Sequence, residues 1–323
     1  MSMEFYPLQF YPILKDRIWG GTKLKSYLGK PIQSNTTGES WEISTVEDSC
    51  SIIKNGLLEG RTLTSLIDLF PIEILGKKVY ENFGKQFPLL IKFIDAREDL
   101  SIQVHPNDYL AKKRHNSFGK TEMWYVMQAD EGARLIVGFK QDSSYEEYIN
   151  CLENKTLLSL LDNQQVNDGD VFFLETGTVH AIGGGIMIAE IQQTSDITYR
   201  LYDFDRVDKN GNQRELHLDL AKDAINFNVV NAKIDYNETK NTSNEIIDCN
   251  YFTTNFLPVE GILEITKNQN SFIIYICTKG VCELHLENQV YNYKLGDVIL
   301  IPAVLTNFKL LGSANLLEVF LKD

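Results

Sequence analysis

The sequence predicts a mainly β protein built as two jelly-roll β-barrels, with a few helices inserted. Most of the chain consists of short apolar or alternating runs rich in Val, Ile, Phe and Tyr, broken by Gly, Asn and Asp. Such runs are typical of β-sandwiches and barrels. The stretch 169–175 (GDVFFLE) also recurs as 296–302 (GDVILIP). A Gly-Asp pair before an apolar strand in both stretches indicates that the barrel occurs twice.

Runs of apolar and alternating residues predict strands in the first two thirds of the chain. These strands are expected at 88–95, 100–105, 122–129, 133–139, 170–175 and 185–193. Three stretches with helical features interrupt them, at 62–86, 144–162 and 219–227. The second of these opens with a capping box, in which Ser144 precedes Glu147 by three residues.

The composition changes after Phe227, where the polar stretch 231–248 shows no strong core pattern. A stretch of this kind is expected to be a connector. We therefore expect one domain over 1–230, which contains the three helical insertions, and a C-terminal β domain over 249–323.

Charge and composition exclude several classes of partner. The net charge of -13 disfavours binding to nucleic acid, and no apolar run reaches the length of about 18 residues that spans a membrane. The N-terminus lacks the features of a signal peptide. The five cysteines form no CxxC pair, which favours reduced thiols in the cytoplasm. We expect a cytoplasmic monomer or homodimer that binds neither nucleic acid nor membrane.

A histidine follows the first copy of the repeat. Gly169, Gly177 and His180 match the spacing G-x5-P-x-G-x2-H, with Glu175 in the proline position. This spacing is the second signature motif of the cupin barrels, in which a glycine turn lets the imidazole point into the barrel. The second copy has Asn307 where the first has His180, so the fold can be built without the histidine.

Three residues upstream of His180 complete a candidate metal site. Gln103 and His105 are two apart on a strand and therefore face the same side, and Glu122 begins the next apolar strand. Two imidazoles, one carboxylate and one amide oxygen suit Zn²⁺, with Fe²⁺, Mn²⁺ or Co²⁺ as alternatives. Each residue alone could equally be a satisfied core or surface group, but their joint order and spacing favour a metal site.

Glu190 and Arg200 lie ten residues apart, across an apparent hairpin. An arginine within a strand of aromatic residues needs an anionic partner. That partner is either Asp203 or Asp205 in a structural ion pair, or an anion bound in the metal pocket.

Together, these motifs resemble the type I mannose-6-phosphate isomerases (phosphomannose isomerases), in their short bacterial form. The resemblance covers nearly the whole chain and is carried by RIWGG (17–21), GESWEIS (38–44), PLLIKFIDA (88–96), LSIQVHPND (100–108), GKTEMWYV (119–126), GTVHAIGGG (177–185) and QQTSDITYRLYDFDR (192–206). It implies a zinc cupin whose ligands are Gln103, His105, Glu122 and His180. The helices at 62–86 would be what remains of the helical domain of longer members.

The resemblance also implies a reaction, the interconversion of mannose 6-phosphate and fructose 6-phosphate through an enediol(ate). Lys120 is then expected to face the same way as Glu122 and to bind a substrate oxygen or shuttle its proton. Glu190, with a pKa raised by burial, is one candidate for the base. An imidazole or a metal-bound hydroxide is the competing assignment for that role.

Three further residues are expected to contact the substrate. Arg200 would bind the phosphate or the enediolate, because its planar fork suits bidentate contact. Ser101 would donate to the phosphate, by resemblance to the family. Trp19 stands beside two glycines, and as an exposed aromatic it would stack on a sugar face at the entrance, although a place in the core is an equal alternative.

Two other classes of function share part of this residue pattern. A cupin dioxygenase would use two histidines and a carboxylate with Fe²⁺, but Gln103 and Arg200 disfavour it. A metal-bearing sugar-binding module or regulator would need no groups that transfer protons, so it would tolerate loss of Lys120 or Glu190.

Overall fold

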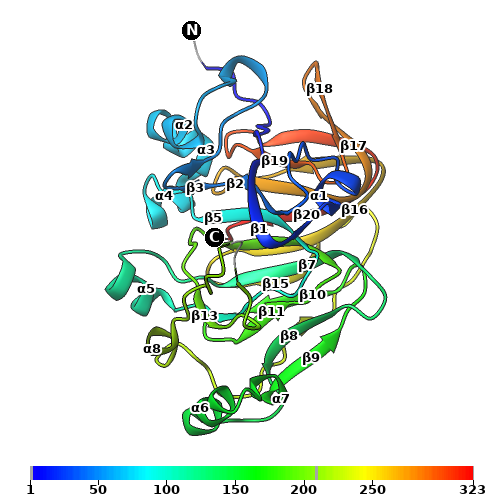
Figure 1. The fold of residues 1–323 in the computed structure, drawn as a ribbon. Coiled ribbons are helices and arrows are strands. Elements are labelled where there is room, and N and C mark those ends of the chain that lie inside the picture. Colours follow the sequence, from blue (N-terminus) through cyan, green and yellow to red (C-terminus); the bar gives the residue numbers. More distant parts are fainter. Residues whose placement is uncertain (1–2, 208–209, 323) are drawn as a thin grey trace.

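Strands dominate the computed structural model, which describes residues 3–207 and 210–322 (Figure 1). The first sheet has the order β1 (Ile13–Gly21), β2 (Thr37–Ile43), β5 (Leu89–Ala96), β12 (Ile186–Gln193), β7 (Glu122–Ala129), β10 (Val171–Leu174) and β14 (Lys233–Ile234). The second has the order β13 (Tyr199–Tyr202), β6 (Ile102–Val104), β11 (His180–Ile182), β8 (Arg134–Phe139) and β9 (Leu161–Gln165). We call them the seven-stranded and the five-stranded sheet.

The C-terminal part forms a third sheet of six strands. Its order is β15 (Asn244–Asp248), β16 (Thr253–Thr266), β20 (Asn307–Phe320), β17 (Ile273–Leu286) and β18 (Gln289–Lys294), with β19 (Val298–Ile301) paired to β17. A small ribbon joins β3 (Thr45–Val46) to β4 (Ser49–Cys50). The mainly β prediction is confirmed, and each strand predicted in the first two thirds of the chain is present.

Helices are few and short. They are α1 (Lys23–Ser26), α2 (Leu63–Leu69), α3 (Pro71–Leu75), α4 (Lys77–Phe83), α5 (Asp108–His115), α6 (Tyr145–Glu153), α7 (Leu157–Leu160) and α8 (Leu218–Ala221), with a 3₁₀ turn at Gly56–Leu58. Ser144 caps α6, because its hydroxyl accepts from the amide of Glu147. None of the helices in the described residues is long and apolar enough to cross a membrane.

The first two sheets face one another, and the alternation of side chains along their strands separates two environments. On β5, Leu89, Ile91 and Phe93 point away from the facing sheet into a core shared with the C-terminal domain. The intervening Lys92 and Ile94 line the cavity between the sheets. Because the side-chain period of a strand is two, every second residue of β5 points to the same face of the sheet. Lys92 and Ile94 therefore point to the face that lines the cavity.

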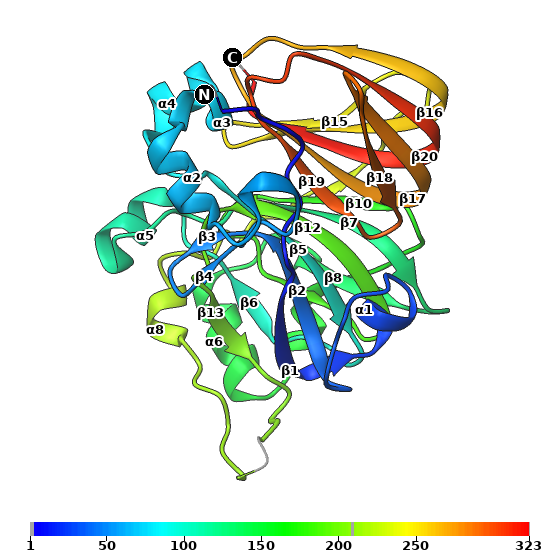
Figure 2. The same ribbon diagram turned by 90° about the horizontal axis from the view of Figure 1, so that it is seen from above.

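A continuous apolar core joins the N-terminal and C-terminal parts. It combines residues of the seven-stranded sheet and of helices α2 to α4 with residues of the C-terminal part, such as Phe272, Ile274 and Leu317. Phe87 stacks on Phe272 with ring centroids 4.9 Å apart. Figure 2 shows the C-terminal strands, in orange and red, packed beside the earlier strands.

The two copies of the repeat follow the same course. Gly169 and Gly296 have φ values of 88° and 86°, a conformation that favours glycine. Strands β10 and β19 follow these glycines, and the next strands begin at His180 and Asn307.

Two local expectations differ from the structure. The stretch 231–248 contains β14 and β15, which pair with β10 and β16, so it is not wholly a connector. Glu190 and Arg200 lie not on a hairpin but on strands of two different sheets. Sequence spacing alone does not distinguish a hairpin from a crossing between sheets.

Candidate active site

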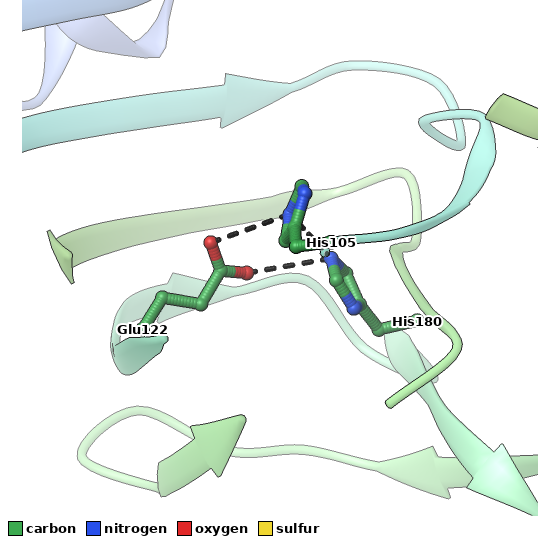
Figure 3. A group of neighbouring side chains, drawn as sticks. All are labelled: His105, Glu122 and His180. Atoms are coloured by element: carbon green, nitrogen blue, oxygen red, sulfur yellow. Dashed lines mark hydrogen bonds and ion pairs between the residues drawn. The ribbon is translucent and has the colours of Figure 1, made fainter. Parts of the chain in front are cut away.

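Three buried side chains converge between the sheets (Figure 3). The Nε2 atoms of His105 and His180 are 3.2 Å apart. The two carboxylate oxygens of Glu122 lie 3.5 Å from His105 Nε2 and 3.4 Å from His180 Nε2. Among the described residues this is the one group of histidine, cysteine and carboxylate side chains close enough to hold a metal ion.

Both imidazoles are oriented by backbone carbonyls. His105 Nδ1 lies 3.0 Å from the oxygen of Ile197, and His180 Nδ1 lies 2.8 Å from the oxygen of Thr178. A proton on Nδ1 satisfies each carbonyl and leaves the Nε2 lone pair directed to the common centre. This is the orientation that histidine ligands have around metals.

The carboxylate of Glu122 is fully buried, and besides the two imidazoles its charged partner among the described residues is Lys120, 2.8 Å from Oε2. Burial raises its pKa to about 7, against the opposing effect of Lys120. Burial, together with the charge of Lys120, lowers the pKa of His180 to about 4 and that of His105 well below its usual value. Two uncharged imidazoles beside a buried carboxylate form a suitable site for a cation. The cation would compensate the charge of the carboxylate and accept the Nε2 lone pair of each imidazole.

Lys120 and Gln103 contact the His105, Glu122 and His180 group and also line the cavity between the two sheets. Lys120 Nζ lies 2.8 Å from Glu122 Oε2 and 3.0 Å from His105 Nε2, as expected from its position two residues before Glu122. Gln103 Nε2 lies 3.3 Å from His180 Nε2, and half a turn of the amide would place its oxygen there instead.

A cavity of about 480 Å³ opens above this group. Its walls are two rows of side chains, one on each facing sheet. On the seven-stranded sheet the strand register places Trp41, Lys92 and Glu190 side by side in the wall, and on the five-stranded sheet it places Arg200 beside Gln103. Further lining residues are Lys15, Arg17, Trp19, Glu39, Ser101, Lys120, Asp196 and Arg214.

Glu190 lies in the cavity wall as predicted, but its pKa is lowered rather than raised. Burial alone would raise it, but Lys92 and Lys120 outweigh burial and lower it to about 2. Lys92 Nζ donates to Glu190 Oε1 at 3.0 Å, and Trp124 Nε1 donates to Oε2 at 2.9 Å. The carboxylate therefore stays ionised at neutral pH, which the sequence could not show because Lys92 lies 98 residues away.

Arg200 makes neither of the two structural ion pairs that its sequence suggested. Asp203 pairs with Arg206 and Arg214, and Asp205 pairs with Lys155. The Nη1 group of Arg200 donates to the carbonyl of Glu215 at 2.7 Å. Its Nε is buried without a hydrogen-bond partner in the described residues. Burial and the charge of Arg214 lower its pKa, so this guanidinium would be stabilised by an anion.

Trp19 and Ser101 both line the cavity, and both are buried. The expectation that Trp19 is an exposed aromatic is therefore wrong. Its ring packs so closely on Gly38 that a Cβ there would lie 2.6 Å from Trp19 Cζ3. Trp19 is therefore both a core residue and a residue of the cavity wall.

Several cavity residues were not predicted from the sequence. Lys92 interrupts an otherwise apolar strand, and that signal could have identified it. Glu39 accepts from Arg17 Nε at 2.9 Å and from Trp41 Nε1 at 2.7 Å. Lys15 lies 3.9 Å from the centroid of the Trp41 ring. Lys15, Arg17 and Glu39 are recognisable as cavity residues only once the strands are assembled, because charged side chains are usually solvated.

Comparison with known proteins places the chain in a family. The profile of the phosphomannose isomerase type I catalytic domain matches residues 8–145, and that of the mannose-6-phosphate isomerase cupin domain matches residues 241–321. The mannose-6-phosphate isomerase ManA of Bacillus subtilis (strain 168) is 37% identical over 97% of this chain and 98% of its own length. That of Streptococcus mutans is 33% identical over 96% of this chain and 97% of its own length.

A solved structure supports the same assignment. The crystal structure of the mannose 6-phosphate isomerase from Bacillus subtilis superposes with a TM-score of 0.88 at 33% identity, over 97% of this chain and 99% of that one. This similarity extends over both β parts of the molecule, not over the metal-binding motif alone. The chain belongs to the type I mannose-6-phosphate isomerase family, as the sequence motifs implied.

Proposed function

We propose that the protein interconverts mannose 6-phosphate and fructose 6-phosphate by moving a proton between C1 and C2 through an enediol(ate). The observation that carries the proposal is that the His105, Glu122 and His180 group contacts two residues, Gln103 and Lys120, that line a cavity together with Arg200. A hexose phosphate requires both a site that polarises adjacent oxygens and a cation for its anionic end.

The proposed metal is Zn²⁺, held by Gln103, His105, Glu122 and His180. Two imidazoles, one carboxylate and one amide oxygen form a borderline donor set that zinc accepts. When bound, the metal would polarise the carbonyl and hydroxyl oxygens of the substrate as a Lewis acid. The paired Nε2 atoms and the buried Glu122 oxygens support this assignment.

Lys120 and Arg200 would be the cations that act on substrate oxygens. Lys120 is buried and lies 2.8 Å from Glu122. Its ammonium would donate a proton to the substrate oxygen that gains negative charge and would later take that proton back. Arg200 would bind the phosphate or the enediolate, because its Nε lacks a partner in the described chain. Ser101 would donate to the phosphate and Trp19 would pack on the sugar.

Glu190 keeps a catalytic assignment in this proposal, but with a different role. A carboxylate with a pKa of about 2 is a poor general base at neutral pH. As an ionised group paired with Lys92, it would stabilise the protonated, positively charged forms of Lys92 and Lys120 in the cavity. Both imidazoles are also poor candidates for the base, because their two nitrogens face a carbonyl and the ligand centre.

We further propose that residues 1–230 form the catalytic domain and that 249–323 form a degenerate cupin domain. The profile matches at 8–145 and 241–321 support this division. A cytoplasmic location agrees with five cysteines that form no disulfide. The protein would act as a monomer or a homodimer.

The decisive experiment is an assay of the pure protein with mannose 6-phosphate, in which fructose 6-phosphate formation is coupled to a reporter reaction. Zinc-loaded protein should turn over, chelator-treated protein should be inactive, and zinc should restore the rate. Absence of fructose 6-phosphate with a full complement of zinc would refute the proposal.

A further inference from the structure

We infer that the C-terminal domain positions Lys120 through a hydrogen-bonded clamp built from Tyr251, Asp108 and Gln193. The inference rests on the proposed function, because it concerns the lysine that would act on the substrate. It assigns a task in the active site to a domain that contributes no residue to the metal group or to the cavity above it.

The backbone amides on both sides of Lys120 are held. Gly119 N donates to Asp108 Oδ1 at 2.8 Å, and Thr121 N donates to Gln193 Oε1 at 2.9 Å. The Gln193 amide also donates to the carbonyl of Thr121 at 3.1 Å. The backbone of Lys120 is therefore attached to its surroundings immediately before and immediately after the residue.

The two attachments are connected. Gln193 Nε2 donates to Asp108 Oδ1 at 3.0 Å, so one carboxylate oxygen receives both the side chain of Gln193 and the amide of Gly119. The approach at Gly119 is close, since a Cβ there would lie 2.8 Å from the amide nitrogen of Asp108. A side chain at this position would push the loop away from α5.

The second oxygen of Asp108 is held from the C-terminal domain. Tyr251 donates its hydroxyl to Asp108 Oδ2 at 2.8 Å across a separation of 143 residues. Tyr251 lies in the tight connection between β15 and β16, which is closed by a hydrogen bond from Cys249 N to the carbonyl of Phe252. Phe252 is buried and meets Phe173 of β10 edge to face at 6.4 Å. The turn that contains Tyr251 is thus held in place by contacts other than its hydrogen bond to Asp108.

Lys120 has a reason to need such a clamp. Its Nζ is buried and lies within 3.0 Å of both His105 and Glu122, so the ammonium has little room to move. It precedes β7 and is not held by the strand ladder. Small displacements of reacting groups can reduce rates by about 100-fold, so a loop residue in this place depends on its neighbours. Asp108, Gln193 and Tyr251 are positioning residues in this scheme.

The test compares Tyr251→Phe with the matched variant Tyr236→Phe. Tyr236 is half-buried like Tyr251, and its hydroxyl also donates one bond of 2.8 Å, to the carbonyl of Gly169 away from Lys120. Each change removes one hydroxyl. Tyr251→Phe should lower kcat roughly three- to tenfold while KM and zinc content stay within about twofold. Tyr236→Phe should leave kcat unchanged, although it should change Tm by about as much as Tyr251→Phe does.

Hydrogen exchange provides a readout that needs neither zinc nor substrate. In metal-free protein, Tyr251→Phe should speed exchange of the Gly119 and Thr121 amides roughly threefold or more, and Tyr236→Phe should not. An unchanged rate of exchange at both amides, or a kcat equal to that of the wild type, would overturn the inference. An inactive wild-type protein would instead count against the proposed function.

A double-mutant cycle tests whether the residues act as one unit. Once Asp108→Ala has removed the acceptor, Tyr251→Phe should cause no further loss of kcat. Losses that multiply would mean that the tyrosine acts by another route and would contradict the clamp.

Discussion

Four charged side chains in and next to the cavity are buried as two pairs of opposite charge. Lys120 pairs with Glu122 and Lys92 pairs with Glu190, and the side chains of all four are at most 7% exposed. Taking two charges out of water is costly, and the loss of one partner leaves the other uncompensated. Arrangements of this kind are therefore typical of functional sites rather than of stabilising cores.

Replacement of Lys120 separates catalysis from metal binding. Lys120→Ala should lower kcat on the order of 100-fold or more with zinc retained, because the donor at the developing charge is lost. The coupled assay and a metal analysis check this. Lys30→Ala is the control, since Lys30 forms a similarly buried pair with Glu42 at 2.7 Å outside the cavity. It should lower stability and leave kcat near the wild-type value. Full isomerase activity of Lys120→Ala would show that Lys120 does not act on the substrate.

Glu190 should give a characteristic dependence of stability on pH. Its folded-state pKa of about 2 lies below the usual 4.5, so the unfolded state binds more protons between these values. The stabilisation by Glu190 is thus present above about pH 4.5 and is lost as the pH falls towards 2, of order 3 kcal/mol in all. Urea unfolding of wild type and Glu190→Gln should show a difference in stability that shrinks on acidification. A constant difference from pH 5 to 3 would contradict the low pKa.

At the scale of secondary-structure elements, the site lies where strand ends and turns meet. Gly177 has a φ of 91°, its amide donates to the carbonyl of His105 at 3.0 Å, and its turn leads to His180. One turn therefore fixes both histidines of the candidate metal site. A Cβ on Gly177 would lie 2.8 Å from the carbonyl oxygen of Ala224, so the turn is also closely packed.

Gly177→Ala should therefore weaken zinc binding at least tenfold and lower stability by more than the roughly 1 kcal/mol expected from an unfavourable φ alone. Competition with a chelator and thermal unfolding measure the two effects. Gly60→Ala is the control, because Gly60 has a φ of 83° and a Cβ there would have no atom within 4 Å. It should show the backbone strain without the loss of zinc. Equal effects of both substitutions would show that close packing at Gly177 is unimportant.

At the scale of the whole molecule, the two β parts share one apolar core. All three tryptophans, at positions 19, 41 and 124, lie in the N-terminal part. Their fluorescence therefore reports on that part alone, whereas far-UV circular dichroism reports on all strands. A shared core predicts that the two signals change together on unfolding.

Phe272→Ala tests this coupling from the C-terminal side. Loss of the ring that stacks on Phe87 should destabilise the protein by about 3–5 kcal/mol. The tryptophan fluorescence transition should move with the circular dichroism transition, although no tryptophan lies in the C-terminal part. Tyr293→Phe is the control, because Tyr293 lies in the separate core of the C-terminal sheet and its hydroxyl has no partner in the described residues. Separate transitions would indicate independent domains.

Local pattern was enough to predict much of this fold and site. Strands such as β5, β7 and β12 were recognisable because each is a short, nearly continuous apolar run, as expected of a strand covered on both faces. The spacing of Gly169, Gly177 and His180 and the pair Gln103 and His105 identified candidate ligands from residue order alone. These features depend on contacts between near neighbours, which the order of residues specifies directly.

Residue order alone was enough to predict the mainly β class, the repeat and the side chains of the candidate metal site. The assembled structure was needed to show that Glu190 and Arg200 line one cavity from different sheets, that Trp19 is buried and that Lys92 keeps Glu190 ionised. The reason is physical. Side-chain periodicity is a local property, whereas burial and the charges around a carboxylate depend on residues brought together from distant parts of the chain.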